Sequence, residues 1–366
     1  MKIAVITPVF ALAGVPLAQV RLAQSLAARG HAVDLLIGRV LDGYSFTPPK
    51  NVHTVIFNRR NVRSLVWPLV QYLRNGKPDV VFSAEDHLNT IVLFAALLSD
   101  SSAKISCSSR VTPFDTYSSR IFSKRWILKQ ASRSVMGRAD ALTCVSKDMV
   151  HQYRTLFKFS PHTWAYNIVS DDSTASRMQE HLDHPWFSSH DTPVLVAAGR
   201  LAPWKGFSDL IEAMVLVCAK RKVRLMILGD GPLRSELQER IEFLGLESVI
   251  QLLGYVNNPL KYFSRADIFV LSSHVEGLPN VLVEAMICGC TPVATDCPTG
   301  PREVLADGRY GYLVEPRNPG SIANGILKSL DCRIPPQQLA EAVQPFTVDV
   351  VIERHFQLLG LSELIK

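Results

Sequence analysis

The sequence predicts an α/β protein of two doubly wound, Rossmann-like domains that face each other across a cleft. The chain has 366 residues, more than one hydrophobic core usually supports. Short apolar runs alternate with amphipathic helical segments, and the alternation restarts after a polar stretch at residues 171–192. Apolar residues make up 47% of the chain, which is enough for two cores.

In the first half, six runs rich in apolar residues predict the strands of a parallel sheet. They are Lys2–Ile6, Ala32–Ile37, Val52–Ile56, Val80–Phe82, Lys104–Ser106 and Ala141–Val145. We therefore assign residues 1–170 to the first domain. The start of the chain imitates a signal peptide, but Pro8 interrupts its apolar run and a strand-loop-helix unit follows, so we expect a mature domain.

The second half repeats the pattern with five further runs. They are Val194–Ala198, Arg224–Leu228, Val249–Leu253, Ile268–Leu271 and Pro292–Ala294. We assign residues 193–349 to the second domain and residues 171–192 to a linker. A last helix within residues 350–366 is expected to pack back on the first domain.

Charge is distributed unevenly along the chain. Residues 1–170 carry 21 Lys and Arg against 9 Asp and Glu, whereas the remainder has an excess of acids. A basic half indicates an anionic partner, either membrane headgroups or a phosphorylated acceptor. Nucleic acid is the alternative, but no nucleic-acid-binding motif is present, so we expect none as partner. Seven irregularly spaced cysteines indicate reduced thiols and a cytoplasmic location.

The stretch Glu276–Glu284 is the most informative motif, because it carries a carboxylate at each end of a strand-to-helix junction. A buried strand precedes it, and Gly277 with Pro279 marks the turn into a helix. Such a junction presents unpaired backbone N–H groups and the positive end of a helix dipole, which suit a phosphate. The two carboxylates would reach different parts of one ligand.

A second motif follows the first strand of the second domain and places Arg200 and Lys205 around a turn. A guanidinium and an ammonium at the carboxyl end of a strand suit a diphosphate. Two solvated surface cations are the alternative interpretation. In the first domain, Gly14 joins the first strand to its helix, and a glycine there lets the backbone approach a phosphate.

Together these motifs resemble the donor-binding half of retaining GT-B glycosyltransferases of family GT4, of the type that makes bacterial polysaccharides and lipid-linked glycans. The similar segments, in order, are Gly199–Gly206, Leu228–Pro232, Leu253–Val256, Glu276–Met286, Asp296–Glu303 and Gly311–Val314. The first half matches more loosely. Where the family commonly has two glycines and a Glu after the first strand, this chain keeps only Gly14.

The resemblance implies a nucleotide-sugar donor, with Glu276, Arg200 and Lys205 as the catalytic residues. Glu276 would contact hydroxyls of the donor sugar and Glu284 the ribose, while the two cations hold the diphosphate. The expected donor contacts are Gly14, Gly199, Arg200, Lys205, Gly231, Tyr255, Val256, Glu276, Gly277, Leu278, Pro279, Asn280, Val281, Leu282 and Glu284. No Asp-x-Asp sequence is present, so we expect neither a metal nor another cofactor, and we assign no protein general base.

Donor identity stays open at this point. The motifs favour a UDP-hexose or UDP-N-acetylhexosamine, with a GDP-mannose-dependent enzyme as the alternative. A nucleotide-sugar epimerase or a non-catalytic nucleotide-sugar-binding partner with the same fold would also fit the motifs. A glycosidase also needs two carboxylates, but it has no use for Arg200 and Lys205 beside a phosphate-sized turn.

The acceptor is expected on the basic first domain. Asp86, His87 and Arg110 follow two of its strands and are candidate acceptor contacts. Residues 117–138 carry six cations, no acid, and apolar residues at helical spacing. Such a helix suits an anionic membrane surface, although its apolar stripe could pack on its own sheet instead. We expect a glycan or lipid-linked acceptor and a peripheral location at the inner face of the cytoplasmic membrane.

Overall fold

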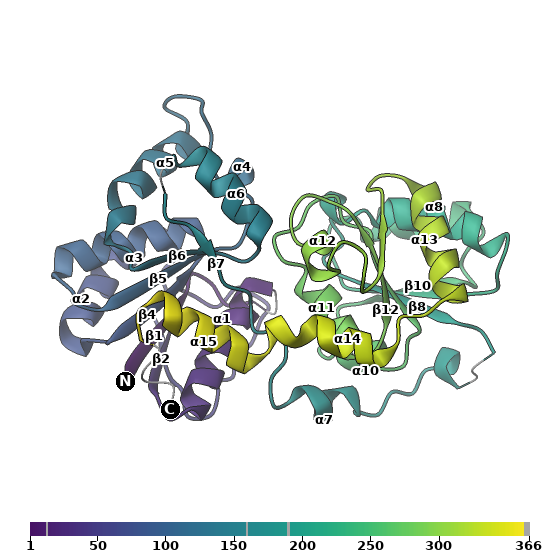
Figure 1. Ribbon diagram of the computed structural model, residues 1–366, viewed down its shortest axis with the longest axis horizontal. Coiled ribbons are helices and arrows are strands. Elements are labelled where there is room, and N and C mark those ends of the chain that lie inside the picture. Colours follow the sequence, from purple (N-terminus) through teal and green to yellow (C-terminus); the bar gives the residue numbers. More distant parts are fainter. Residues whose placement is uncertain (12–13, 159, 189–190, 362–366) are drawn as a thin grey trace. The chain divides into compact units, whose positions relative to one another are not determined.

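The structure is a computed structural model that describes residues 1–11, 14–158, 160–188 and 191–361. It divides into two compact units (Figure 1). The first comprises Met1–Asp171 with the C-terminal segment from Thr347, and the second comprises Asp172–Phe346. Each unit contains one parallel sheet with helices on both faces, as the sequence predicts. Each unit, taken by itself, is therefore a doubly wound, Rossmann-like α/β fold.

The first unit has a seven-stranded sheet in the order β3-β2-β1-β4-β5-β6-β7. Its strands are β1 (Lys2–Thr7), β2 (Ala32–Ile37), β3 (His53–Ile56), β4 (Val80–Ala84), β5 (Lys104–Ser109), β6 (Ala141–Cys144) and β7 (Thr163–Trp164). Its helices are α1 (Gly14–Ala28), α2 (Val66–Gly76), α3 (Asp86–Ser99), α4 (Pro113–Thr116), α5 (Lys124–Val135), α6 (Lys147–Leu156) and α15 (Val348–Leu358). The strand order reverses between β1 and β4. In doubly wound sheets, ligands bind beyond the carboxyl ends of the strands at such a reversal.

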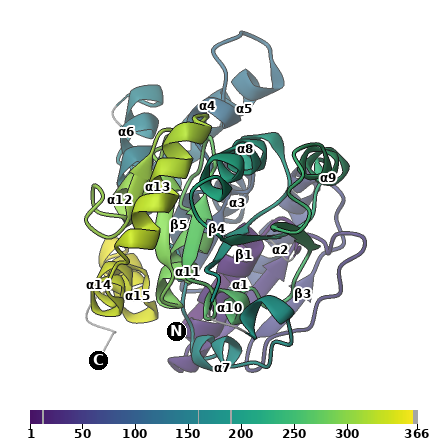
Figure 2. The same ribbon diagram turned by 90° about the vertical axis from the view of Figure 1, so that its right-hand side faces the viewer.

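The second unit repeats this plan with six strands in the order β10-β9-β8-β11-β12-β13. They are β8 (Val194–Ala198), β9 (Arg224–Leu228), β10 (Ile250–Gly254), β11 (Ile268–Leu271), β12 (Thr291–Thr295) and β13 (Tyr312–Val314). Its helices are α7 (Thr174–Met178), α8 (Phe207–Cys218), α9 (Arg234–Phe243), α10 (Leu260–Phe263), α11 (Asn280–Ile287), α12 (Pro301–Val304), α13 (Pro319–Asp331) and α14 (Pro336–Val343). Figure 2 shows α8 and α13 on one face of this sheet and α11 and α14 on the other. The strand order reverses between β8 and β11.

The central strands are continuous apolar runs because helices cover both of their faces. All five residues of β8 and all four of β11 are buried. Side chains of α8 and α13 pack on this sheet to form the core of the second unit. The two strands that flank the order reversal therefore form a rigid base, on which the following loops are held.

The C-terminal helix α15 belongs to the first unit. The ring of His355 packs edge-on against Phe82 of β4 at 5.3 Å, and Phe356 packs in the same way against His31. The Arg354 guanidinium donates to the Trp164 carbonyl at 3.3 Å. The chain therefore crosses to the second unit and returns to the first.

Three local features differ from the sequence predictions. The basic helix expected over residues 117–138 begins only at Lys124, because Ser123 caps it by accepting a hydrogen bond from the Trp126 N–H. The predicted linker, residues 171–192, contains α7, and the chain belongs to the second unit from Asp172 onward. The short edge strands β7 and β13 were not predicted as strands, because two or three residues give too little periodicity.

Candidate active site

The loops after β8 and β11 bring together two of the residues predicted to be catalytic. Lys205 ends a short 3-10 turn, Pro203–Lys205, in the loop after β8. Glu276 lies in the loop after β11, five residues beyond the strand. Because β8 and β11 are neighbours in the sheet, residues 71 positions apart in the chain meet at its carboxyl edge.

Lys205 and Glu276 form a direct ion pair, with 2.6 Å between Lys205 Nζ and Glu276 Oε1. The hydroxyl of Ser273 donates a second hydrogen bond to the same carboxylate oxygen, also at 2.6 Å. The side chains of Lys205 and Glu276 are only 19% and 11% exposed, so solvent screens the pair weakly. In this structure the two predicted catalytic groups neutralise each other.

The turn that carries Lys205 requires a glycine at position 206. Gly206 has a left-handed φ of 63°, and a Cβ added there would lie 2.0 Å from the Ser272 carbonyl oxygen. In addition, the Ser272 hydroxyl donates to the Lys205 carbonyl at 2.9 Å. The backbone before Glu276 and the backbone that carries Lys205 are therefore in close contact.

Residues 298–300 form a second set of contacts with the loop after β11, at Glu276 and at Pro279. The Glu276 N–H donates to the Pro298 carbonyl at 3.2 Å, and the Thr299 hydroxyl donates to the Glu276 carbonyl. A Cβ added at Gly300 would lie 2.6 Å from Pro279 Cδ, so the two loops are packed closely. Helix α11 then begins at Asn280, and its preceding residue provides no side-chain cap for the first N–H groups.

The remaining predicted donor contacts are more dispersed. Arg200 is exposed and forms no ion pair with another residue in the described part of the chain. Gly14 is the first residue of α1, and a Cβ added there would meet no atom within 4 Å, so packing does not require a glycine. At Gly231 an added Cβ would lie 2.5 Å from the Leu201 carbonyl oxygen, which gives this glycine a packing role.

The rest of the predicted donor contacts lie on loops of the second unit and in α11. Tyr255 is 48% exposed just after β10, and Val256 follows it. Leu278, Pro279 and Leu282 are buried, whereas Gly199, Gly277, Asn280, Val281 and Glu284 are partly buried. Glu284 lies within α11, one turn after its first residue, so it is separated from Glu276 by the turn.

The acceptor candidates follow β4 and β5, next to the strand-order reversal of the first sheet. Asp86 is 5% exposed, and it accepts hydrogen bonds from the Ser109 hydroxyl at 2.7 Å and the Tyr153 hydroxyl at 2.5 Å. Burial raises its pKa. These bonds fix the Asp86 carboxylate in place, and its contact with an acceptor stays a prediction. His87 is exposed on the first turn of α3.

The neighbouring Glu85 has the properties expected of a ligand contact. Its backbone has a φ of 79°, which is unusual for a residue with a side chain. Burial raises the pKa of its carboxyl to about 7, although nearby Arg110 acts in the opposite direction. Arg110 donates to Gln19 Oε1 at 3.0 Å, while its buried Nε and Nη1 have no hydrogen-bond partner among the described residues. The backbone strain and the burial of Glu85 leave no pattern in the sequence, so only the tertiary structure shows them.

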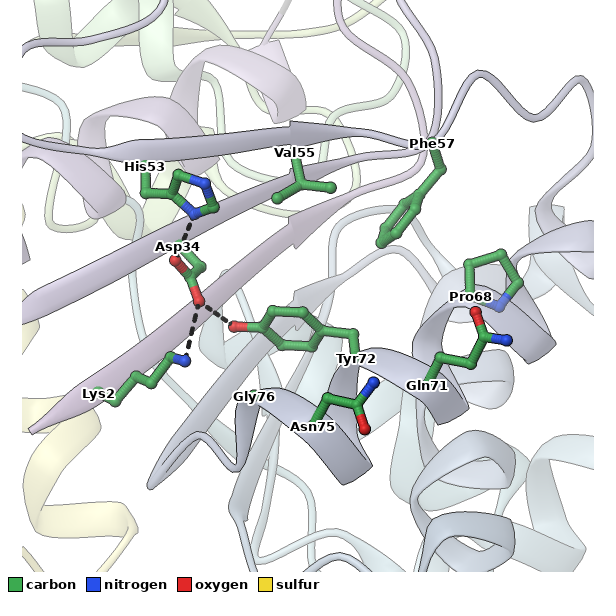
Figure 3. A pocket seen from close by; sticks show the side chains of 10 residues that line it. All are labelled: Lys2, Asp34, His53, Val55, Phe57, Pro68, Gln71, Tyr72, Asn75 and Gly76. Atoms are coloured by element: carbon green, nitrogen blue, oxygen red, sulfur yellow. Dashed lines mark hydrogen bonds and ion pairs between the residues drawn. The ribbon is translucent and has the colours of Figure 1, made fainter.

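A pocket of about 450 Å³ lies elsewhere in the first unit, between β3 and α2 (Figure 3). In it Asp34 accepts hydrogen bonds from the Tyr72 hydroxyl at 2.5 Å and from His53 Nδ1 at 2.8 Å. Lys2 lies 3.8 Å from the same carboxylate. Lys2, Asp34 and His53 lie in the first halves of their strands, so this pocket is not at the carboxyl edge and contains no predicted site residue.

Sequence reasoning missed two further residues beside the ion pair. His274 Nε2 lies 2.6 Å from Asp209 Oδ2, and its backbone N–H donates to the Trp204 carbonyl at 2.8 Å. No local pattern links positions 65 residues apart, so nothing in the sequence points to this pair. Among the described residues, no group of three or more His, Cys, Asp or Glu side chains is arranged to hold a metal ion.

Comparison with known proteins identifies the family. Residues 14–172 match the model of Glycosyltransferase Family 4, and residues 179–345 match that of Glycosyl transferases group 1. An uncharacterized glycosyltransferase of Methanocaldococcus jannaschii is 29% identical, over 72% of this chain and 72% of its own. An N-acetylgalactosamine-N,N'-diacetylbacillosaminyl-diphospho-undecaprenol 4-alpha-N-acetylgalactosaminyltransferase of Campylobacter jejuni is 32% identical, over 53% of this chain and 52% of its own.

Solved structures agree in fold. Anabaena HepE in complex with UDP aligns with a TM-score of 0.75 and 19% identity, covering 98% of this chain and 100% of its own. The lipopolysaccharide outer core galactosyltransferase WaaB aligns with a TM-score of 0.73 and 19% identity, covering 99% of this chain and 100% of its own. The two family models together match nearly the whole chain. The protein therefore belongs to the family 4 glycosyltransferases and is a hexosyltransferase with the GT-B fold.

Proposed function

We propose that the protein transfers a hexose or N-acetylhexosamine, with retention of anomeric configuration, from a UDP-sugar to a glycan or lipid-linked acceptor in the synthesis of a surface polysaccharide. One observation carries this proposal: Lys205 and Glu276 meet at the strand-order reversal of the second sheet, with exposed Arg200 on the same loop as Lys205. A cationic group and a carboxylate at this edge suit the diphosphate and the sugar of one donor.

Charge development explains how these residues would promote transfer. When the bond from the anomeric carbon to the diphosphate breaks, negative charge accumulates on the leaving phosphate oxygen. Arg200 and Lys205, held on a fixed turn, would stabilise that charge as it forms. The leaving oxygen itself would accept the proton of the attacking hydroxyl, so the reaction needs no protein base and, in this proposal, no metal.

UDP is favoured over other nucleotides because a solved relative, HepE, has been crystallised with UDP, UDP and glucose, and UDP-glucose. The name of the Campylobacter relative supports an acceptor in which a sugar is attached through a diphosphate to a polyprenol. A diphosphate-bearing acceptor also agrees with the basic first half of the chain.

Contact with an anionic membrane surface at the cytoplasmic side belongs to the same proposal. Ile121 and Phe122, just before α5, are 62% and 82% exposed, and Ile127 on α5 is 54% exposed. Helix α5 begins with Lys124 and Arg125 and contains no acidic residue. Exposed apolar side chains among cations are typical of a peripheral membrane surface. Within the described residues, no helix is long and apolar enough to cross a bilayer.

Calorimetric titration with UDP, GDP and ADP, first without metal and then with magnesium, tests the donor assignment. We expect UDP to bind without metal, and Arg200→Ala to weaken that binding about tenfold. Arg221→Ala is the matched control, because Arg221 pairs with Asp331 on the surface of the same unit. Preferred binding of GDP would favour the GDP-mannose alternative, and binding of no nucleotide would contradict the proposal.

Product analysis then separates the classes of activity. Incubation with UDP-sugars should release UDP and place the sugar on an added acceptor. An epimerase would convert the sugar nucleotide without releasing UDP, and a non-catalytic partner would bind it unchanged. Transfer with inversion would contradict the proposed retention.

A further inference from the structure

His274 lies between the two loops that carry the proposed catalytic residues. It follows Ser273 in the loop after β11, two positions before Glu276. Its side chain is 18% exposed and its partner Asp209, in the first turn of α8, is 24% exposed. A carboxylate only accepts hydrogen bonds, so the proton must lie on His274 Nε2, which donates to Asp209 Oδ2 at 2.6 Å.

The same histidine contacts the turn that ends in Lys205. Its backbone N–H donates to the Trp204 carbonyl at 2.8 Å, immediately before Lys205. A Cβ built on Gly206 would lie 3.0 Å from His274 Nε2, so the ring is packed directly against this turn. His274 thus holds the turn through its backbone and its ring, and holds the following helix through Asp209.

We propose that His274 and Asp209 are positioning residues that fix the turn of Lys205 against the loop of Glu276, and so keep the lysine ammonium within reach of the donor diphosphate. The inference rests on the proposed function, because that proposal assigns Lys205 to the donor diphosphate. The contacts that His274 makes do not depend on it. Neither residue needs to touch the donor. Their effect passes through the Lys205 backbone, because the Lys205 carbonyl already accepts a hydrogen bond from Ser272, two positions before His274.

The lysine side chain makes this restraint important. A lysine has four rotatable bonds and a compact charge, so its ammonium is placed well only when its backbone and stem are fixed. The stem packs over Gly199, where an added Cβ would lie 3.6 Å from Lys205 Cδ and Cε. A displacement of about 1 Å at a catalytic group can reduce turnover by about 100-fold.

The variants His274→Ala, His274→Gln and Asp209→Ala test the proposal, with His53→Ala as matched control. The control removes another His–Asp contact, that of His53 with Asp34 at 2.8 Å, which lies in the first unit away from both loops. The first measurement is hydrogen exchange of the Lys205 and His274 amides, which donate to the Ala202 and Trp204 carbonyls. We expect His274→Ala to speed this exchange at least tenfold and the control to leave it unchanged.

The second measurement is the release of UDP from a UDP-sugar with water as the only acceptor, alongside calorimetric UDP binding. We expect His274→Ala and Asp209→Ala to lower turnover about 10- to 100-fold, with a smaller loss of UDP affinity. His274→Gln should recover most of the turnover, because the glutamine amide can donate to Asp209 from a position close to that of Nε2. In a Lys205→Ala background, His274→Ala should have no further effect.

Two results would overturn the proposal. One is turnover within twofold of wild type in His274→Ala; the other is an equal loss with and without Lys205, which would mean that His274 acts on something else. If His274→Ala unfolds, Asp209→Ala decides, since turnover within twofold of wild type in that variant would also overturn the proposal. If wild type binds no UDP, the proposed function fails, while the exchange measurement still supports or refutes the positioning role.

Discussion

The ion pair between Lys205 and Glu276 leads to a quantitative prediction for Glu276→Gln. Two unit charges 2.6 Å apart attract by about 6 kcal/mol at an effective dielectric constant of about 20. Desolvation offsets most of this attraction, and breaking a fully buried pair costs about 3–5 kcal/mol. Because both side chains keep some exposure, we expect the variant to lose about 2 kcal/mol of unfolding free energy.

The same change should strengthen nucleotide binding. In the proposed function Lys205 holds the diphosphate, so it would first have to leave Glu276, and part of the binding free energy would be lost in breaking the pair. Without the carboxylate that loss disappears, and about 2 kcal/mol corresponds to about 30-fold tighter UDP binding as an upper limit. Sugar transfer should nevertheless fall strongly, because the neutral amide lacks the carboxylate charge that the proposed function places against the donor sugar.

Calorimetry with UDP and with a UDP-sugar, together with urea unfolding, measures these effects. Glu212→Gln is the matched control, since Glu212 pairs with Arg240 on the surface of the same unit. This control should leave UDP affinity unchanged. A tenfold weaker UDP affinity in Glu276→Gln would refute the idea that the carboxylate competes with a diphosphate for Lys205, and wild-type transfer would refute the site assignment.

Single features of the structure support four more predictions. Arg200→Ala should weaken UDP binding about tenfold without changing the melting temperature, because the exposed guanidinium has no ion-pair partner among the described residues. Gly206→Ala should lower the urea midpoint, corresponding to a loss of more than about 1 kcal/mol of unfolding free energy. The reason is that the added Cβ would lie 2.0 Å from the Ser272 carbonyl oxygen. Burial, assisted by neighbouring arginines, lowers the pKa of His355 to about 3, from about 6.5 in the unfolded chain. The stabilising contribution of neutral His355 is therefore complete above about pH 6.5 and declines as pH falls toward 3. The first unit should lose about 3 kcal/mol of unfolding free energy by pH 4. Phe122→Asp should reduce flotation with anionic vesicles several-fold.

The predictions for Phe122 and His355 each have a comparison variant. Phe243→Asp replaces another strongly exposed aromatic residue, on the second unit, and should not affect vesicle flotation. Equal loss in both aromatic variants, or in neither, would argue against a membrane surface near α5. His355→Leu should remove part of the acid sensitivity measured by urea unfolding at about pH 7.5 and 4.5, and an unchanged pH difference would contradict the role of His355. An unaltered midpoint in Gly206→Ala would mean that its turn is not tightly packed.

The sequence was sufficient for the parts of the protein that local patterns encode. Apolar runs at strand spacing predicted both sheets, and the restart after residue 171 predicted two units. Turn residues such as Pro279 predicted where α11 begins. The short edge strands and the start of α5 were not predicted, because their bounds depend on pairing with a neighbouring strand or on a single cap.

For the site, the sequence selected the kinds of residue and the loops that carry them, because a glycine, a cation or a carboxylate after a buried strand is a local signal. It did not determine which side chains pair. The tertiary structure decided three pairings. Glu276 meets Lys205, and His274 meets Asp209. Asp86 accepts hydrogen bonds from the Ser109 and Tyr153 hydroxyls. The physical reason is that strand order and parallel pairing bring distant loops to one edge, where burial and hydrogen bonding then fix the partners.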